Sequence, residues 1–353
     1  MPGSPSRRSW SRRCSRPSWA RRRRRRRWTR RRRRSARPAS NRAPDPVVAL
    51  APTVPRRAGG ARRWSPDKAP WPYLALPLLL IAALLGLPVL RIFWQSVHHV
   101  VLTAPWEGND FVGPENFLAL VQEPAFLRTL QLTVIWTACS VGAKLLIGLG
   151  GALLLQRPFP GRKVYLALLM LPWVTPAVIA AISWRWVLDG QSGWINAVLL
   201  VTGAIREPIS FLGQETTAFI ATVVVDAWLG IPFMVVTLMA GLQRIPDDYI
   251  EAARIDGARP MQIFRRITLP LLRPVLMTCV LLSTVWTFNS FQVIWPLTKG
   301  GPAGATATLP IQIYETAFGS FDFGTSSAMA VVVFAILMSV SLLYWRVLKG
   351  GEE

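Results

Sequence analysis

The sequence predicts an all-α polytopic membrane protein with six transmembrane helices and both termini in the cytoplasm. Two features lead to this prediction. The composition is 51% hydrophobic and only 17% charged, which is more apolar than an ordinary soluble domain. In addition, six apolar runs are about as long as the roughly 20 residues that a helix needs to cross a bilayer. The runs are approximately Trp71–Trp94, Leu130–Leu155, Val164–Leu188, Thr216–Leu242, Val275–Leu297 and Ser326–Trp345.

The first run could be mistaken for a secretory signal peptide. Its length exceeds that of a typical signal-peptide apolar region, and no small-residue cleavage pattern follows it in LRIFWQSVHHV. We therefore expect the first run to be retained as a span. Aromatic residues near the ends of several later runs, such as Trp184, Trp295 and Trp345, suit the headgroup layer of a bilayer.

The basic residues gather in alternate connections between the runs. Arg157, Arg162 and Lys163 follow the second run, six arginines lie between Arg244 and Arg273, and Arg346 and Lys349 end the last run. The other connections carry mostly acidic residues. Because cytoplasmic loops are enriched in Lys and Arg, this distribution places both termini inside and three loops outside.

The net charge of +23 is concentrated before the first run. Residues 1–70 hold 24 Arg and Lys against two Asp, whereas residues 71–353 hold 17 basic and 16 acidic residues. The basic segment offers almost nothing to bury, so we expect a disordered cytoplasmic tail over 1–70 and a membrane domain over 71–353. Attraction to anionic lipid, casual binding of nucleic acid and a merely solvated extension remain open for the tail, and we expect no specific nucleic-acid partner.

The residues that most enzymes and metal sites require are sparse. His98 and His99 are adjacent and so do not share a helix face, and the three cysteines are far apart in sequence. No Gly-rich loop ending in Gly-Lys-Ser/Thr occurs, so the chain lacks that phosphate cradle for ATP hydrolysis. We therefore expect no catalytic residues, no metal site and no cofactor, and we do not expect the chain to be an enzyme.

A polar segment with the sequence IPDDYIEAARIDGARPMQIFRRITLP separates the fourth and fifth runs. Pro246 and the two following Asp residues suit the first turn of a short helix, and Gly257 suits its end. A second short helix is expected from Pro260 to Pro270, with Ile263, Phe264 and Ile267 on one side. The segment 246–270 should therefore form two short helices joined by a glycine turn.

Seven residues of this segment resemble the EAA motif of bacterial ATP-binding-cassette importer permeases. They are Glu251, Ala252, Ala253, Gly257, Ile267, Leu269 and Pro270. In that family the segment forms coupling helices that dock into a groove of the ATPase subunit, so the resemblance implies that the energy for transport comes from another polypeptide. An ordinary amphipathic surface loop is the alternative reading of the same residues.

Further stretches resemble carbohydrate-importer permeases, namely FVGPENF, LMLPWVTPAVIAAISWRWVLDGQSGWINAVL and LTKGGPAGATATLPIQIYETAFGSFDFGTSSA. The GGP at Gly300–Pro302 resembles the first permease subunit of such importers, the maltose-F and glycerol-phosphate-A type. This resemblance implies a type I importer permease fold in the bacterial inner membrane. It also implies three partners: a second permease subunit, an ABC ATPase dimer and an extracytoplasmic solute-binding protein. The second permease type, a secondary transporter and a tail-dependent nucleic-acid-binding membrane protein remain alternatives.

Two helix faces in the fourth and fifth runs carry candidate solute-binding residues. Recurrence at three- and four-residue steps places Asp226, Leu229, Gly230 and Phe233 on one face, and Ser283, Thr287 and Ser290 on another. Polar groups inside a membrane usually face a cavity or a partner.

Both faces match the residues that line the sugar site in maltose-type permeases. Asp226, Thr287 and Ser290 stand where that pattern has amides, so the resemblance implies a sugar or polyol other than maltose, and a buried Asp would disfavour an anionic one. Packing between helices is the alternative for the hydroxyl residues. For Asp226 the alternative is an ion pair with Lys144, although we expect the two to lie at different depths. We also expect a discontinuity at Pro232.

Overall fold

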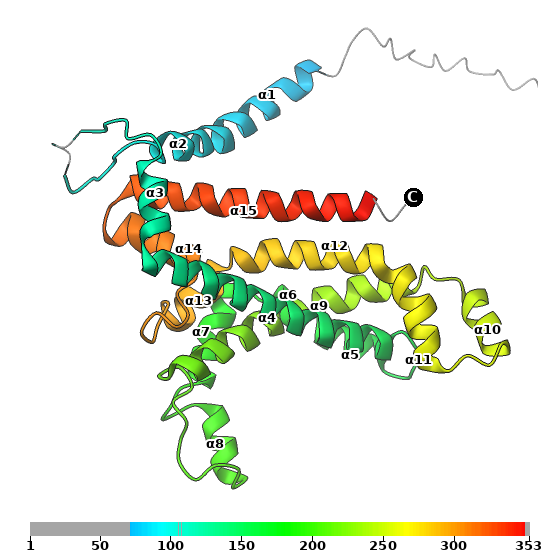
Figure 1. The fold of residues 1–353 in the computed structure, drawn as a ribbon. Helices are drawn as coiled ribbons and strands as arrows, with labels where there is room; N and C mark the ends of the chain where they lie inside the picture. The colour runs from blue at the N-terminus through cyan, green and yellow to red at the C-terminus, as the bar shows by residue number, and fades with distance from the viewer. Residues whose placement is uncertain (1–70, 105, 107, 350–353) are drawn as a thin grey trace, which may run out of the picture. The chain divides into compact units, whose positions relative to one another are not determined.

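The protein is described here by a computed structural model that covers residues 71–104, 106 and 108–349. The chain divides into two units, residues 1–68 and 69–353. The first unit, which contains the predicted disordered tail, lies outside the described residues. In the described part of the second unit the elements are helices, without a strand, and two isolated β-bridges join His98 to Phe111 and Val101 to Asp322 (Figure 1). The predicted all-α class is confirmed for this part of the chain.

Five helices in the described residues are long and apolar enough to cross a membrane, or six if one bent pair counts as a single span. Three of them are unbroken α-helices at the second, fourth and sixth predicted runs: α4 (Pro124–Leu155), α9 (Glu215–Leu242) and α15 (Phe323–Lys349). Of these helices, α4 and α9 lie side by side, whereas α15 packs against α2 and α12 (Figure 1). The predicted discontinuity at Pro232 is wrong, because α9 continues through this residue.

The first span consists of α1 (Trp71–Ile81), a π-helical turn (Ala82–Gly86) and α2 (Leu87–Gln95). Pro88 lies just after the π-helical turn, and inside a continuous α-helix its missing N–H and its ring would disturb the preceding turn. The wider π-helical turn just before this proline accommodates it without ending the span.

The third span is bent rather than straight, in contrast to the predicted run Val164–Leu188. It contains α5 (Arg162–Leu169), α6 (Leu171–Val174) and α7 (Ala177–Val187), and the helix axes turn by 98° between its two halves. The cause is local: Thr175 precedes Pro176 and adopts an extended conformation with ψ 127°, because the proline ring disfavours a helical residue before it.

The fifth span differs from the sequence prediction at both ends. It begins at α11 (Pro260–Ile263), passes a π-helical turn (Phe264–Thr268) and continues as α12 (Leu269–Phe288). Pro270 was expected to end a separate surface helix, but the π-helical turn lets the chain continue through it. The helix instead ends near Asn289, before α13 (Phe291–Thr298) begins. The predicted run Val275–Leu297 therefore joins two helices that the structure separates.

The remaining helices lie in the connections. They are α3 (Glu115–Gln122), α8 (Trp194–Val201), α10 (Asp247–Ile255) and α14 (Leu309–Tyr314), which is followed by a π-helical turn (Glu315–Gly319). The helices α10 and α11 lie at one end of the spans, whereas α3, α8 and α14 lie toward the other (Figure 1).

The central contact of the membrane unit joins α4 to α9. Gly148 packs so closely on Met234 that a Cβ atom at position 148 would overlap the Met234 Cβ, and one at Gly151 would lie 2.9 Å from a Val235 methyl. Nearer the other end of the pair, the Trp136 indole N–H donates to the Thr222 hydroxyl over 3.0 Å. Small residues at such contacts let helix backbones approach, which is how spans gain packing energy in lipid.

We predict that Gly148→Val destabilises the protein, because the added side chain forces α4 away from α9. Overpacking of this kind costs about 1–3 kcal/mol. Gly150→Val is the matched control, since a Cβ at Gly150 meets nothing within 4 Å. Thermal unfolding of both variants in lipid nanodiscs measures the effect, and equal melting temperatures for the two would contradict the proposed helix contact.

Candidate functional site

A pocket of about 270 Å³ lies where two of the spans are interrupted. Thr175 marks the break between α6 and α7, and Ser290 marks the break between α12 and α13. Both residues line the pocket. The complete lining is Lys144, Pro172, Trp173, Thr175, Ala177, Asp226, Leu229, Gly230, Trp286, Thr287, Ser290 and Val293. A break in a helix leaves backbone N–H and C=O groups at membrane depth free to bind a solute, whereas a continuous helix uses them in its own hydrogen bonds.

The polar part of the pocket is a buried group of three side chains from three helices. The Lys144 ammonium of α4 lies 2.6 Å from the Asp226 carboxylate of α9, and it donates a hydrogen bond of 2.7 Å to the Thr287 hydroxyl of α12. Lys144 and Asp226 are each 5% exposed, and Thr287 is fully buried. The expectation that Lys144 and Asp226 lie at different depths is therefore wrong. Asp226 both pairs with Lys144 and lines the pocket.

Gly230 makes room for this arrangement. A Cβ atom at position 230 would lie 2.6 Å from Lys144 Cε and 2.7 Å from Cδ. The absence of a side chain therefore lets the lysine stem cross the surface of α9 and reach Asp226, one turn away on the same face. Glycine at position 230 therefore makes the ion pair possible, and it also lines the pocket.

Aromatic rings form the apolar part of the site. Trp173 stacks on Phe233 with ring centres 5.2 Å apart and an interplanar angle of 17°. Trp286 meets Phe233 edge to face at 5.1 Å and lies 5.9 Å from Trp173. Trp173 is 43% exposed and Trp286 is 49% exposed, so both rings present open surface beside the buried charges.

The structure brings together most of the predicted substrate-binding residues. Asp226, Leu229, Gly230, Thr287 and Ser290 line the pocket. Phe233 lies behind the two tryptophans and supports them through ring contacts. Ser283 is buried at 3% exposure and does not belong to the lining.

Sequence reasoning missed seven residues of the lining as binding residues: Lys144, Pro172, Trp173, Thr175, Ala177, Trp286 and Val293. Lys144 was considered only as a pairing partner. No break was predicted at the prolines on either side of Trp173 in LPWVTP, and helical periodicity cannot say which side chains a break turns inward. Trp286 is adjacent to Thr287, and neighbours in sequence are not expected to share a helix face.

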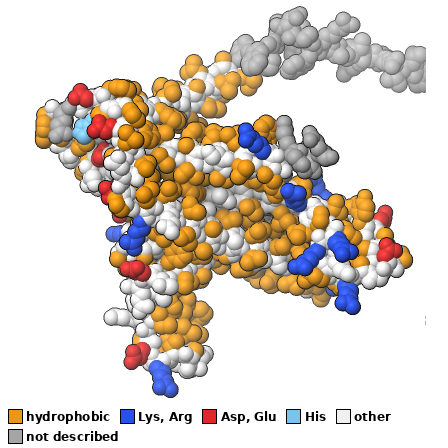
Figure 2. Space-filling model, viewed as in Figure 1, with side chains coloured by type: hydrophobic (Ala, Val, Ile, Leu, Met, Phe, Trp, Pro, Cys, Tyr) orange, Lys and Arg blue, Asp and Glu red, His pale blue; other side chains and the backbone are white. Residues whose placement is uncertain are grey.

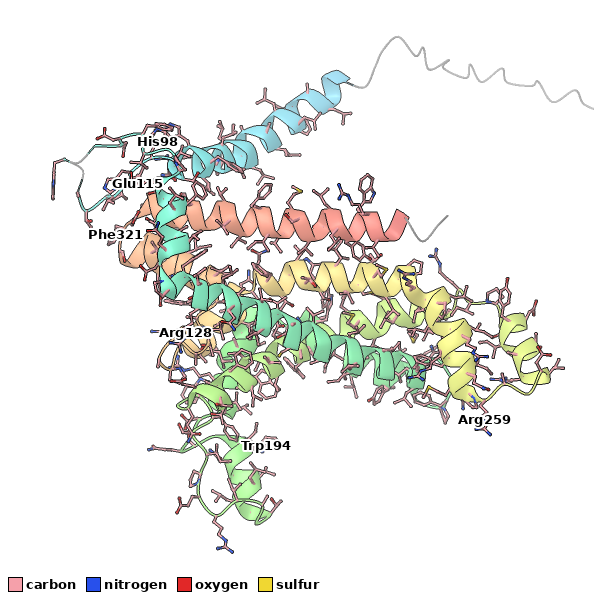
Figure 3. The ribbon with its side chains drawn as sticks, in the orientation of Figure 1. His98, Glu115, Arg128, Trp194, Arg259 and Phe321 are labelled. Carbon is pink, nitrogen blue, oxygen red and sulfur yellow. The ribbon has the colours of Figure 1, made fainter. Side chains whose placement is uncertain are left out.

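The coupling segment, residues 246–270, forms α10 and α11 with a turn at Gly257 between them. Gly257 has a positive φ of 79°, a conformation that favours glycine. At the start of α11, the Arg259 backbone N–H donates a hydrogen bond of 2.7 Å to the side-chain oxygen of Gln262. Figure 3 labels Arg259 at the start of α11, in the same part of the molecule as α10.

The residues of the predicted EAA motif divide into exposed and inward-facing members. Glu251, Ala252, Gly257 and Pro270 are exposed, whereas Ala253 is buried and Ile267 and Leu269 are partly buried. A pocket of about 580 Å³ separates α10 from the ends of α4 and α9, and Glu251 lines it. Ile255, which is 87% exposed, and Tyr249, which is 57% exposed, add apolar surface to α10.

The described residues contain no group of three or more His, Cys, Asp or Glu side chains that could hold a metal ion. The pocket offers hydrogen-bonding side chains beside flat aromatic rings. This combination suits the binding of a polar organic molecule, because the rings cover its apolar faces while the charged and hydroxyl groups exchange hydrogen bonds with its polar groups.

We predict that Asp226→Leu alone strongly destabilises the protein, because it leaves the Lys144 ammonium buried without its carboxylate. Breaking a buried pair in this way costs about 3–5 kcal/mol, whereas replacing both partners with apolar residues is often close to neutral. The double variant Lys144→Met with Asp226→Leu should therefore recover most of the lost stability. Thermal unfolding in nanodiscs checks this, and a double variant as unstable as the single one would count against the ion pair.

Comparison with known proteins gives a consistent assignment. The family described as "Binding-protein-dependent transport system inner membrane component" matches residues 144–349. A probable ABC transporter permease protein of Brucella suis biovar 1 is 36% identical over 282 residues, which cover 80% of this chain and 97% of that protein. The trehalose/maltose transport system permease protein MalF of Thermococcus litoralis is 36% identical over 275 residues, which cover 78% of this chain and 92% of that protein.

The fold matches that of a solved transporter. A bacterial ABC transporter involved in the import of the acidic polysaccharide alginate aligns with a TM-score of 0.66, covering 81% of this chain and 99% of the other at 22% sequence identity. At that identity the likeness concerns the fold alone. Together with the family match and the two relatives, it leads to one conclusion: the chain belongs to the inner membrane components of binding-protein-dependent transport systems and is a multi-pass permease of the ABC importer class.

Proposed function

We propose that the pocket is the solute site of an ATP-driven importer, and that the solute is a sugar or a related polyol. The observation that carries this proposal is the placement of Trp173 and Trp286 directly beside the buried group of Lys144, Asp226 and Thr287. A sugar ring has one apolar face and a rim of hydroxyl groups. Such a molecule can stack on the tryptophans while its hydroxyls bond to Lys144, Asp226 and Ser290. The relative from Thermococcus litoralis, named for trehalose and maltose, supports this solute class.

The pairing of Asp226 changes the expected charge of the solute. An isolated carboxylate would repel an anion, but the Lys144 ammonium at 2.6 Å offsets that charge. The charge of the site therefore does not select against acidic sugars, contrary to the inference from the sequence. Shape and hydrogen bonding would then decide among neutral and acidic solutes.

The exposure of the site suggests that this chain supplies half of it. Both tryptophans keep more than two fifths of their surface open, and an open apolar surface of this kind marks a place where another molecule packs. We propose that a second permease subunit closes the pocket from this side, with this chain as the first, maltose-F-type subunit. The MalF name of one relative favours that order of subunits.

The coupling segment is proposed to receive an ABC ATPase dimer. The exposed side chains of Tyr249 and Ile255, together with Met261 at 62% exposure, provide apolar surface on a segment otherwise rich in charge. The segment joins α9 to the continuous helix from Pro260 to Phe288. These are the two helices that carry Asp226 and Thr287, so a displacement of the segment would reach the pocket through rigid elements.

The remaining parts of the proposal concern location and chemistry. The arginines of the coupling segment and the positive-inside rule favour a cytoplasmic position for that segment in the bacterial inner membrane. An extracytoplasmic solute-binding protein would then deliver solute at the opposite end of the spans. ATP hydrolysis would take place on the ATPase dimer, and this chain would move solute without being an enzyme itself.

We predict that Gly257→Val uncouples transport, because a β-branched residue is strained at a φ of 79°. Gly257→Asn is the matched control, since asparagine tolerates this conformation and nothing lies within 4 Å to clash with either side chain. The measurement is solute-stimulated ATP hydrolysis and uptake by the reconstituted importer. An assembled Val variant that couples as well as the wild type would contradict a coupling role for this segment. Uptake that persists in the absence of the ATPase would favour a secondary transporter.

We predict that Trp286→Leu weakens uptake by raising the KM about fivefold, which corresponds to the loss of roughly 1 kcal/mol of aromatic contact. Trp186→Leu is the control, because Trp186 is 72% exposed on α7 and does not line the pocket. Basal ATP hydrolysis should stay unchanged in both variants. Equal KM values for the two variants would indicate that the rings only pack against a partner subunit.

A further inference from the structure

A short arm, residues 189–213, extends from the end of α7 and contains α8 (Trp194–Val201). In Figure 1 α8 runs across the direction of α9, α12 and α15, and it lies away from α10 and α11, toward the other end of the spans. Its eight residues are too few to cross a bilayer, which needs about 20. The arm therefore extends sideways, along the plane that a membrane surface would occupy.

The arm is held together by its own polar groups. The buried Asn196 side-chain nitrogen donates to the backbone oxygens of Asp189, Gly190 and Ile209 over 3.3, 3.1 and 2.9 Å. In return, the Ile209 N–H donates to the Asn196 side-chain oxygen over 3.0 Å. The two limbs of the arm are thus tied to each other, and its shape does not depend on an outside partner.

One face of α8 is apolar and uncovered. Trp194, Val198 and Val201 recur at four- and three-residue steps and are 69%, 40% and 88% exposed. Figure 2 shows hydrophobic side chains gathered along one side of the arm, and backbone with other side chains along the opposite side. Trp194 stands at the start of α8 (Figure 3), where an amphipathic indole ring suits the headgroup layer.

The charged groups of the arm lie off this face, in the loops around α8. Hydrogen bonds from the Ser192 backbone N–H, the Ser192 hydroxyl and the Gln191 N–H lower the pKa of Asp189, which therefore stays charged and favours water. Arg206 and Glu207 follow α8 in the other loop. An exposed, uncharged apolar helix that is too short to span a bilayer and is flanked by charged loops suits a membrane interface.

The helix α7, which contacts α8, also exposes apolar side chains. Ile179, Ile182 and Trp186 of α7 are 57%, 45% and 72% exposed, and they belong to the bent third span. A protein partner of α8 would be expected to meet about one hydrogen-bonding group per 100–200 Å² of interface. The face of α8 offers only the Trp194 indole N–H for that purpose, which favours lipid over protein as its neighbour.

We propose that α8 lies flat in the bilayer interface opposite the coupling segment, with Trp194, Val198 and Val201 in the outer acyl region of that leaflet. The arm would then be a lateral membrane anchor next to α7, whose first residue, Ala177, lines the solute pocket. This inference goes beyond the proposed transport function and does not depend on it, since it concerns lipid contact by a segment outside the pocket.

Site-directed spin labelling tests the anchor. Single cysteines are introduced at Val201, Val198 and Gln191 of the full-length chain after Cys14, Cys139 and Cys279 have been replaced by alanine. The labelled protein is studied in phospholipid nanodiscs, alone and in the assembled importer. Oxygen, which concentrates in lipid, should relax the labels at 201 and 198 more than a water-soluble nickel chelate does, and the reverse should hold at 191.

Two results would overturn the proposal. Equal accessibility of the labels at 201 and 191 to the nickel chelate would place α8 in water. Protection of the labels at 201 and 198 from both reagents would show a protein covering the face, either a second permease subunit if it requires the assembled importer, or another copy of this chain if it does not. If the Val201→Cys variant misfolds and cannot be labelled, the label at position 198 still tests the proposal.

Discussion

The packing of three helices depends on the buried ammonium of Lys144, which requires partners inside the membrane. Lys144 carries an ammonium into the middle of α4, and an unpaired charge at membrane depth is costly. Asp226 on α9 and Thr287 on α12 provide its partners at 2.6 and 2.7 Å. The ion pair and the hydrogen bond together join three helices at one depth. Gly230 leaves the space that the lysine stem needs to reach Asp226.

The same cluster connects the pocket to the coupling segment. Below Asp226, α9 continues without interruption to Leu242, and the segment that follows leads into the helix that carries Thr287 and Trp286. The π-helical turn at Phe264–Thr268 allows this helix to pass Pro270 and remain continuous. A force applied to α10 and α11 therefore acts on α9 and α12. These two helices both contact Lys144, through Asp226 and Thr287. The breaks at Thr175 and Ser290 line the same pocket as the pair.

The sequence predicted the parts of this structure that depend on local pattern. Apolar length was enough to find α4, α9 and α15, and turn chemistry was enough to place Gly257 between α10 and α11. Features that depend on contact between distant segments were not predictable in this way. The bend at Thr175 lies inside a continuous apolar run, so hydropathy did not reveal it. The contact between Lys144 and Asp226 could not be inferred, because the position of a residue along one helix does not give the register between two helices. Trp173 and Trp286 were missed for the same reason: their role follows from how helices meet, not from their spacing within one helix.

In the proposed mechanism, the pocket between the helix breaks holds the solute during transport. The rate at which a thiol reagent modifies Ser290→Cys in the assembled importer, with Cys14, Cys139 and Cys279 replaced by alanine, tests this most directly. If the solute occupies the pocket, solute supplied by its binding protein slows modification, and trapping the ATPase changes the side of the membrane from which the reagent reaches the cysteine. A modification rate that changes with neither solute nor nucleotide state would show that the pocket is not the solute site.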